Sequence, residues 1–252
     1  MISASEFSRF KTQTLVMATG YDFPMARILE EAGVDAILVG DTLAMVVLGL
    51  PSTREVDMDI MSVFVGAVCR GAKRTHVIAD MPYGSDLDSA KAVANGRRFL
   101  ALGAHSVKLE GAKLEIIRNL TAEGIPVFGH VGLLPQTAKS FKQVGRDPAE
   151  RDEILKSAEA VAKSGAIGMV LEHMPSDLAA QITRAVDVPT VGIGAGREVD
   201  GQVLVLHDFL GIYPGPFPPF VKVFADMHGT ALEGVRKYCR AVRERTFPEL
   251  KA

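Results

Sequence analysis

Four acids, a lysine and a histidine stand at the ends of short apolar segments of the sequence. The segments that carry them read Val39-Gly-Asp-Thr, Ile78-Ala-Asp-Met, Val107-Lys-Leu-Glu-Gly, Gly129-His-Val-Gly and Val170-Leu-Glu-His. Charged groups beside apolar runs are expensive to remove from water, so their repeated placement here indicates a function. If the segments are parallel barrel strands, these side chains meet at the carboxyl ends, where barrel enzymes place their catalytic groups.

Three of the acids, Asp41, Asp80 and Glu110, follow three successive apolar segments. Two carboxylates about 4 Å apart repel by roughly 4 kcal/mol at an effective dielectric constant of 20. A hard divalent cation removes this repulsion, and oxygen-only ligands favour Mg²⁺ or Mn²⁺. We therefore predict a metal site at these three acids. The alternative for each acid is that it caps the following helix or pairs with a nearby arginine.

The remaining charged groups are candidates for handling the substrate. Lys108 precedes Glu110 by two positions, so both side chains lie on the same side of a strand; Lys108 suits a substrate carboxylate or an enolate oxygen, or else it neutralises the acids. Glu172 is a candidate general base that would face an acidic C–H bond, or a partner in a structural salt bridge. His130 would bind substrate, contact Glu172, or serve a structural role.

The segments that must position these groups alternate along the chain. Short apolar strands are predicted at 14–18, 36–39, 76–79, 106–109, 126–128, 168–171, 190–193 and 203–206. Amphipathic helices are predicted between and after them at 23–32, 58–70, 86–101, 113–123, 149–163, 176–186 and 221–246. Most of the strand segments are continuously apolar, as strands covered on both faces are.

Glycine follows five of the predicted helices, at Gly33, Gly71, Gly103, Gly124 and Gly165, where a helix end favours a left-handed residue. Alternating strands and helices indicate a parallel α/β sheet, and about eight strands in 252 residues favour a closed (β/α)8 TIM barrel. Because no linker or change of composition divides the chain, we predict a single domain over residues 1–252.

The composition excludes several classes of protein. The formal net charge is −2, which argues against a nucleic-acid partner. No apolar run approaches the roughly 18 residues of a membrane span, so no membrane partner is expected. The amino-terminal residues lack the apolar core of a signal peptide. Two distant cysteines, Cys69 and Cys239, fit a reducing environment. We therefore expect a cytoplasmic protein.

Taken together, the segments resemble the ketopantoate hydroxymethyltransferase family from about Thr14 to Phe247. The resemblance is carried by Thr19-Gly-Tyr-Asp-Phe, Leu38-Val-Gly-Asp-Thr-Leu-Ala-Met, Ala79-Asp-Met-Pro-Tyr, Val107-Lys-Leu-Glu-Gly, Gly129-His-Val-Gly-Leu-Leu-Pro-Gln, Val170-Leu-Glu, Gly192-Ile-Gly-Ala-Gly and Asp200-Gly-Gln-Val-Leu-Val-Leu-His-Asp. Several such blocks in order are far more specific than any one of them.

The resemblance implies a TIM barrel that transfers a hydroxymethyl group from 5,10-methylenetetrahydrofolate to 3-methyl-2-oxobutanoate, giving 2-dehydropantoate on the way to pantothenate. It implies that Asp41, Asp80 and Glu110 hold one Mg²⁺ per subunit, and that Glu172 accepts a proton. The 2-oxo acid would contact the residues Asp41, Thr42, Asp80, Lys108 and His130. A homo-oligomer, a decamer in this family, is also implied.

The sequence departs from the family pattern around the predicted substrate pocket. Thr42 replaces serine, Ala44 replaces glycine, Tyr83 replaces phenylalanine, Leu50-Pro51 replaces a more polar pair, and the 137–146 loop is about three residues short. Loops determine substrate choice on this fold. Two alternatives therefore stay open: a paralogous metal-dependent lyase, aldolase or mutase acting on another 2-oxo acid, and a catalytically silent paralogue that binds a metabolite.

Overall fold

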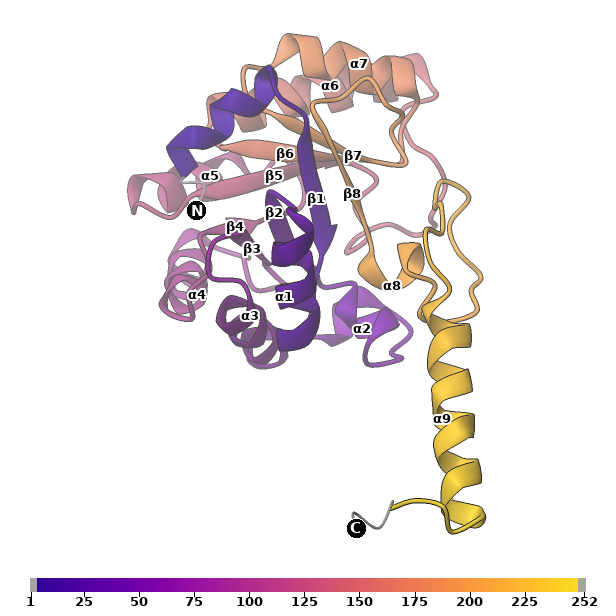
Figure 1. Ribbon diagram of the computed structural model, residues 1–252. Helices are drawn as coiled ribbons and strands as arrows, with labels where there is room; N and C mark the ends of the chain where they lie inside the picture. The colour runs from indigo at the N-terminus through magenta and orange to yellow at the C-terminus, as the bar shows by residue number, and fades with distance from the viewer. Residues whose placement is uncertain (1–3, 249–252) are drawn as a thin grey trace. The chain divides into compact units, whose positions relative to one another are not determined.

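Eight parallel strands close into a barrel in the computed structural model of the chain, which describes residues 4–248 (Figure 1). Each strand pairs with its neighbour in the sequence, and the last pairs with the first. The strands are β1 (Leu15–Thr19), β2 (Ala36–Val39), β3 (His76–Asp80), β4 (Ser106–Lys108), β5 (Val127–Gly132), β6 (Gly168–Glu172), β7 (Thr190–Ile193) and β8 (Gly201–Leu204). The predicted (β/α)8 TIM barrel is thus confirmed.

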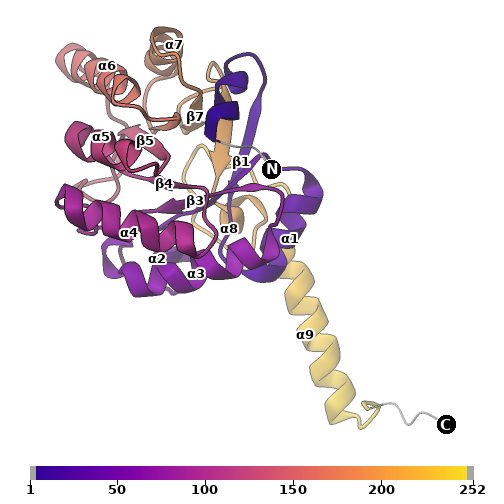
Figure 2. The ribbon, with the colours of Figure 1, turned by 90° about the vertical axis from the view of Figure 1, so that its left-hand side faces the viewer.

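Helices connect the strands and cover the outside of the barrel; α4, α5 and α6 lie in a row outside the strands in Figure 2. The α-helices are α1 (Phe23–Ala32), α2 (Leu43–Val46), α3 (Met58–Gly71), α4 (Ser89–Ala101), α5 (Leu114–Ala122), α6 (Pro148–Lys163), α7 (Ser176–Ala185), α8 (Leu206–Phe209) and α9 (Met227–Arg243). Two 3-10 helices, η1 (Ala4–Lys11) and η2 (Thr53–Glu55), complete the set within the described residues.

Most predicted boundaries agree with the structure to within three residues. The larger differences are at β5, which extends four residues past Phe128, and at α9, which begins at Met227 rather than at Val221. The α9 start has a local cause, because the side chain of Asp226 accepts a hydrogen bond from the backbone N–H of Gly229 and so caps the helix.

Four of the five predicted helix-ending glycines adopt the left-handed conformation: Gly33, Gly103, Gly124 and Gly165. Gly71 does not, and that prediction is wrong. It is the last residue of α3, and an added Cβ would lie 2.5 Å from the carbonyl oxygen of Phe23 in α1. The glycine at this position therefore permits two helices to approach closely, rather than ending one of them.

The amino-terminal end of the barrel is filled by η1. Phe7 and Phe10 are buried in one cluster with residues that open several strands, including Leu15 and Ala36. The Phe7 ring makes edge contacts with Phe128, at a centroid distance of 5.5 Å, and with His76, at 4.6 Å. This plug closes the end of the barrel opposite to the one at which the strands finish.

By its internal packing the chain divides into two compact units, one that ends at Leu204 and one that begins at Val205. The first contains the barrel strands, and the second contains α8 and α9. The prediction of one domain over residues 1–252 stays a prediction. Within residues 4–248, no helix is both long enough and apolar enough to cross a membrane.

Candidate active site

The predicted site residues lie where the strands end. Asp80, Lys108 and Glu172 are the last residues of β3, β4 and β6, and His130 lies in β5. Three others lie within three residues of a strand end: Asp41 and Thr42 come after β2, and Glu110 comes after β4. Because β2, β3 and β4 are neighbours in the barrel, the three predicted metal acids come from adjacent strand ends.

Asp80 and Lys108 form the closest charged pair of the site. The Lys108 Nζ donates to both carboxylate oxygens of Asp80, at 2.7 and 2.8 Å, and both side chains are buried. One of these oxygens also accepts from the backbone N–H of Asp41, at 3.3 Å. Burial opposes the charge of Lys108, but the carboxylates of Asp80, Glu110 and Asp41 outweigh burial and raise the pKa of Lys108.

In the other two acids, Asp41 and Glu110, burial has the largest effect on the pKa. Loss of water raises the pKa of Asp41 well above its ordinary value, and the neighbouring charge of Asp80 raises it further, while Lys108 offsets part of the effect. Burial also raises the pKa of Glu110, against the opposing influence of His130 and Lys108. The negative charge in this cluster is therefore only partly compensated by protein groups.

His130 lies between two carboxylates. Its Nδ1 is 3.7 Å from Glu110 Oε1, and its Nε2 is 3.3 Å from Glu172 Oε2. Within residues 4–248 neither ring nitrogen has a hydrogen-bond partner, although the ring is buried. Glu172 is more open, with its side chain 18% exposed. The predicted proximity of His130 to Glu172 is thus observed, and Glu172 stands at the more accessible end of this row.

Sequence reasoning missed two polar residues of the site. Tyr21 is buried, and its hydroxyl lies 2.8 Å from Thr42 Oγ1, so the Thr42 hydroxyl bonds to Tyr21 and makes no capping bond to α2. Gln136, also buried, lies in the loop after β5 and donates to Asp41. Both belong to segments that carry the family resemblance, but neither is charged, and a search for ionisable groups passes over them.

The acids fit a hard divalent cation by their chemistry. Asp41, Asp80 and Glu110 offer only oxygen ligands, are buried, and face the single ammonium of Lys108. As the side chains stand, no group of three or more His, Cys, Asp or Glu among residues 4–248 is arranged to hold an ion. Because both oxygens of Asp80 accept from Lys108, an ion at Asp80 would share that carboxylate with the ammonium.

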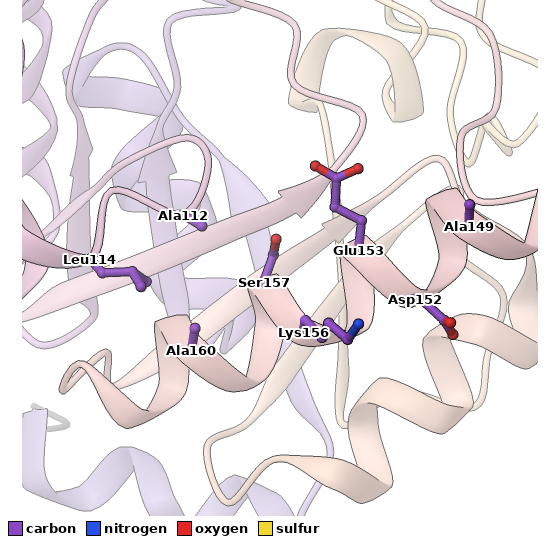
Figure 3. A pocket seen from close by; sticks show the side chains of 8 residues that line it. All are labelled: Ala112, Leu114, Ala149, Asp152, Glu153, Lys156, Ser157 and Ala160. Carbon is purple, nitrogen blue, oxygen red and sulfur yellow. The ribbon is translucent and has the colours of Figure 1, made fainter.

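A separate hollow of about 490 Å³ lies on the outside of the barrel, between the start of α5 and α6 (Figure 3). Its lining consists of Ala112, Leu114, Ala149, Asp152, Glu153, Lys156, Ser157 and Ala160. None of the predicted site residues lines it. We therefore place the candidate site at the strand ends and not in this hollow.

The acids and the lysine lie at the strand ends of a (β/α)8 barrel, where barrel enzymes place their catalytic groups, and sequence comparison specifies the family. The pattern of the family described as ketopantoate hydroxymethyltransferase matches residues 2–250. A 3-methyl-2-oxobutanoate hydroxymethyltransferase from Carboxydothermus hydrogenoformans is 47% identical over 246 residues, which is 95% of this chain and 89% of that protein. One from Thermus thermophilus is 46% identical, covering 98% of this chain and 97% of its own length. The chain belongs to the ketopantoate hydroxymethyltransferase family.

Solved structures with little sequence similarity share the fold. A phosphonopyruvate hydrolase in complex with oxalate and Mg²⁺ superposes with a TM-score of 0.66 at 14% identity, covering 100% of this chain and 90% of that one. A phosphoenolpyruvate phosphomutase from Streptomyces platensis subsp. rosaceus gives 0.65 at 14% identity, covering 99% and 92%. At this identity the likeness shows the architecture alone.

Proposed function

We propose that the protein transfers a hydroxymethyl group from 5,10-methylenetetrahydrofolate to 3-methyl-2-oxobutanoate, giving 2-dehydropantoate for pantothenate biosynthesis. The observation that carries the proposal is the near full-length similarity to relatives named 3-methyl-2-oxobutanoate hydroxymethyltransferase. The buried acids and lysine at the strand ends support it, because they suit a small substrate that bears a carboxylate and a keto group.

Asp41, Asp80 and Glu110 would hold one Mg²⁺. When bound, the ion would supply Lewis-acid chemistry by drawing electron density from the keto group of the substrate, which makes the adjacent C3–H bond more acidic. Lys108 keeps a positive charge in the buried site and would bind the carboxylate or the developing enolate oxygen of the substrate.

Glu172 would accept the C3 proton. Its carboxylate is more exposed than that of Glu110, so it can meet a substrate, and His130 Nε2 lies 3.3 Å from it. The enolate carbon then attacks the one-carbon unit of the folate. A carbon–carbon bond forms and both carbon–nitrogen bonds of the folate methylene bridge break. Water supplies the hydroxyl group, and the C3 proton and the remaining proton of the water end on the two folate nitrogens. Thr42, held by Tyr21, would place its hydroxyl near the substrate carboxylate.

We further propose that the protein acts as a homo-oligomer, with a decamer expected from the family resemblance. Helix α9 supports the assembly, because none of its residues is buried and its apolar side chains are exposed, including Leu232, Val235, Tyr238 and Val242. Exposed apolar stripes of this kind commonly mark a protein interface.

The transfer itself tests the proposed activity. Purified protein, Mg²⁺ and methylenetetrahydrofolate carrying ¹³C in the methylene group would be incubated with 3-methyl-2-oxobutanoate, and the label followed by NMR. The expected result is a labelled hydroxymethyl carbon bonded to C3 and release of tetrahydrofolate. Parallel reactions with pyruvate and 2-oxobutanoate measure substrate choice. A product formed only from one of these other acids would overturn the assigned substrate.

A further inference from the structure

Gln136 occupies an unusual place beside the acid cluster. It lies in the segment between β5 and α6 and is 3% exposed. Its polar groups reach residues that follow three other strands: Asp41 after β2, Met81 after β3 and Glu110 after β4. One residue thus joins the strand ends that carry the three predicted metal acids.

The orientation of the Gln136 amide is determined by its partners. Nε2 donates to Asp41 Oδ2 at 2.8 Å and to the carbonyl oxygen of Met81 at 2.9 Å. A side-chain amide nitrogen carries two hydrogens, so both are used. The reversed amide would place its oxygen against two acceptors, which excludes that orientation. The bond to Asp41 is consequently a directed bond from an amide N–H to a carboxyl oxygen.

The backbone of Gln136 makes two more contacts with the site. Its N–H donates to Glu110 Oε2 at 3.0 Å, and its carbonyl oxygen accepts from Arg54 Nε at 2.6 Å. Arg54 lies in η2, and its guanidinium stands over the ring of Tyr83, 5.3 Å from the centroid. The Gln136 backbone is therefore fixed from the rim of the site by Arg54 as well as from within by Glu110.

We propose that Gln136 is a positioning residue of the active site: its amide orients the Asp41 carboxylate, and its backbone N–H fixes the Glu110 carboxylate. With their orientations restrained in this way, the two carboxylates would offer their oxygens to a divalent cation and to the substrate. This inference rests on the proposed function, because it assumes that these acids bind a cation.

Two variants test separate parts of the assignment. Gln136→Met keeps roughly the length of the side chain and the backbone N–H, so it removes the bonds to Asp41 and Met81 while the bond to Glu110 remains possible. Arg54→Met changes an exposed residue and removes the contact to the Gln136 carbonyl, together with the contact between the guanidinium and the Tyr83 ring, while the Gln136 side chain stays intact. Gln181→Met, at an exposed position of α7, is the matched control for the glutamine substitution.

Binding of Mn²⁺, followed by electron paramagnetic resonance of the free ion, is the measurement. Groups that orient metal ligands typically contribute about 10- to 100-fold in affinity, so Gln136→Met is expected to raise the Kd for Mn²⁺ by that factor. Arg54→Met is expected to raise it by a smaller factor, and Gln181→Met is expected to leave it unchanged. A purely structural role would lower the melting temperature of Gln136→Met without changing the Kd of the folded protein.

The outcomes separate this inference from the proposed function. Wild-type protein that binds Mn²⁺ with the same Kd as both Gln136→Met and Arg54→Met would overturn the positioning role alone. Wild-type protein that binds no Mn²⁺ would overturn the proposed metal site, and the positioning role with it. If Gln136→Met does not fold, an unchanged Kd in Arg54→Met would still contradict the assignment.

Discussion

Several charged side chains of the site are buried, and few opposite charges lie near them. Lys108 faces Asp80 directly, and Asp41 and Glu110 contribute further negative charge around it. Removing one partner of a buried pair leaves the other charge without compensation, and that cost exceeds the net contribution of the intact pair. The acid cluster is therefore expected to be sensitive to changes at Lys108 even before substrate binds.

Lys108→Met is predicted to lower the free energy of unfolding by about 3–5 kcal/mol, because it leaves the Asp80 carboxylate buried without its ammonium partner. Urea denaturation followed by circular dichroism measures the change. The double variant Lys108→Met/Asp80→Asn should recover much of the stability while remaining inactive. Lys156→Met, at an exposed position of α6, should stay within about 0.5 kcal/mol of wild type.

Cys69 gives a prediction of pH dependence. Burial raises the pKa of its thiol from an ordinary 9.0 to about 11, so below pH 9 the reactive thiolate is scarce. In a Cys239→Ser variant, labelling of Cys69 by a disulfide reagent should rise about tenfold per pH unit from pH 8 to 10. A labelling rate that levels off between pH 9 and 10 would contradict the raised pKa.

Among the helices and strands, segments with a clear apolar period could be predicted from the sequence, and the shortest helices could not. The longer helices and all eight strands follow from apolar periodicity and glycine punctuation, as at α1, whose bounds agree with the prediction. The plug η1 and the short helices α2, η2 and α8 were not predicted, because three to eight residues contain too few turns to establish a period. Their conformation depends on tertiary contacts such as the burial of Phe7.

A substitution at the contact between β5 and β6 tests how tightly the barrel wall is packed. An added Cβ at Gly168 would lie within 2.4 Å of the Phe128 ring, so Gly168→Ala is predicted to destabilise the protein by about 1–3 kcal/mol. Thermal unfolding measures the effect. Phe128→Leu in the same chain should offset part of the loss, and strict additivity of the two changes would argue against the contact as its cause.

The candidate site was predictable to the extent that its residues are charged. Barrel enzymes place catalytic groups at the carboxyl ends of their strands, which predicted that Asp80 and Lys108 lie close together. The structure places them in direct contact. Gln136 and Tyr21 lacked such a signal, because an uncharged polar side chain is common in loops and only its partners reveal its role. Those partners, Asp41 and Thr42, lie far away in the sequence and are known only from the folded chain.

For the whole molecule, the exposed apolar side chains of α9 predict that several copies of the chain assemble into an oligomer. A decamer of 27.0 kDa chains has a mass of 10 × 27.0 = 270 kDa, which light scattering after size exclusion would measure. Val235→Glu, at an exposed position of α9, should reduce the mass by placing a charge in the proposed interface. Wild-type protein that elutes as a monomer would contradict the proposed oligomer.

The proposed reaction requires Glu172 to remove the C3 proton of a 2-oxo acid bound at the strand ends. The most direct measurement is the loss of the C3 proton signal of 3-methyl-2-oxobutanoate in D₂O, followed by NMR with and without Mg²⁺. Wild-type protein and Glu115→Gln, a control at an exposed position of α5, should exchange the proton in a metal-dependent reaction. Glu172→Gln should abolish the exchange; undiminished exchange in that variant would contradict the account.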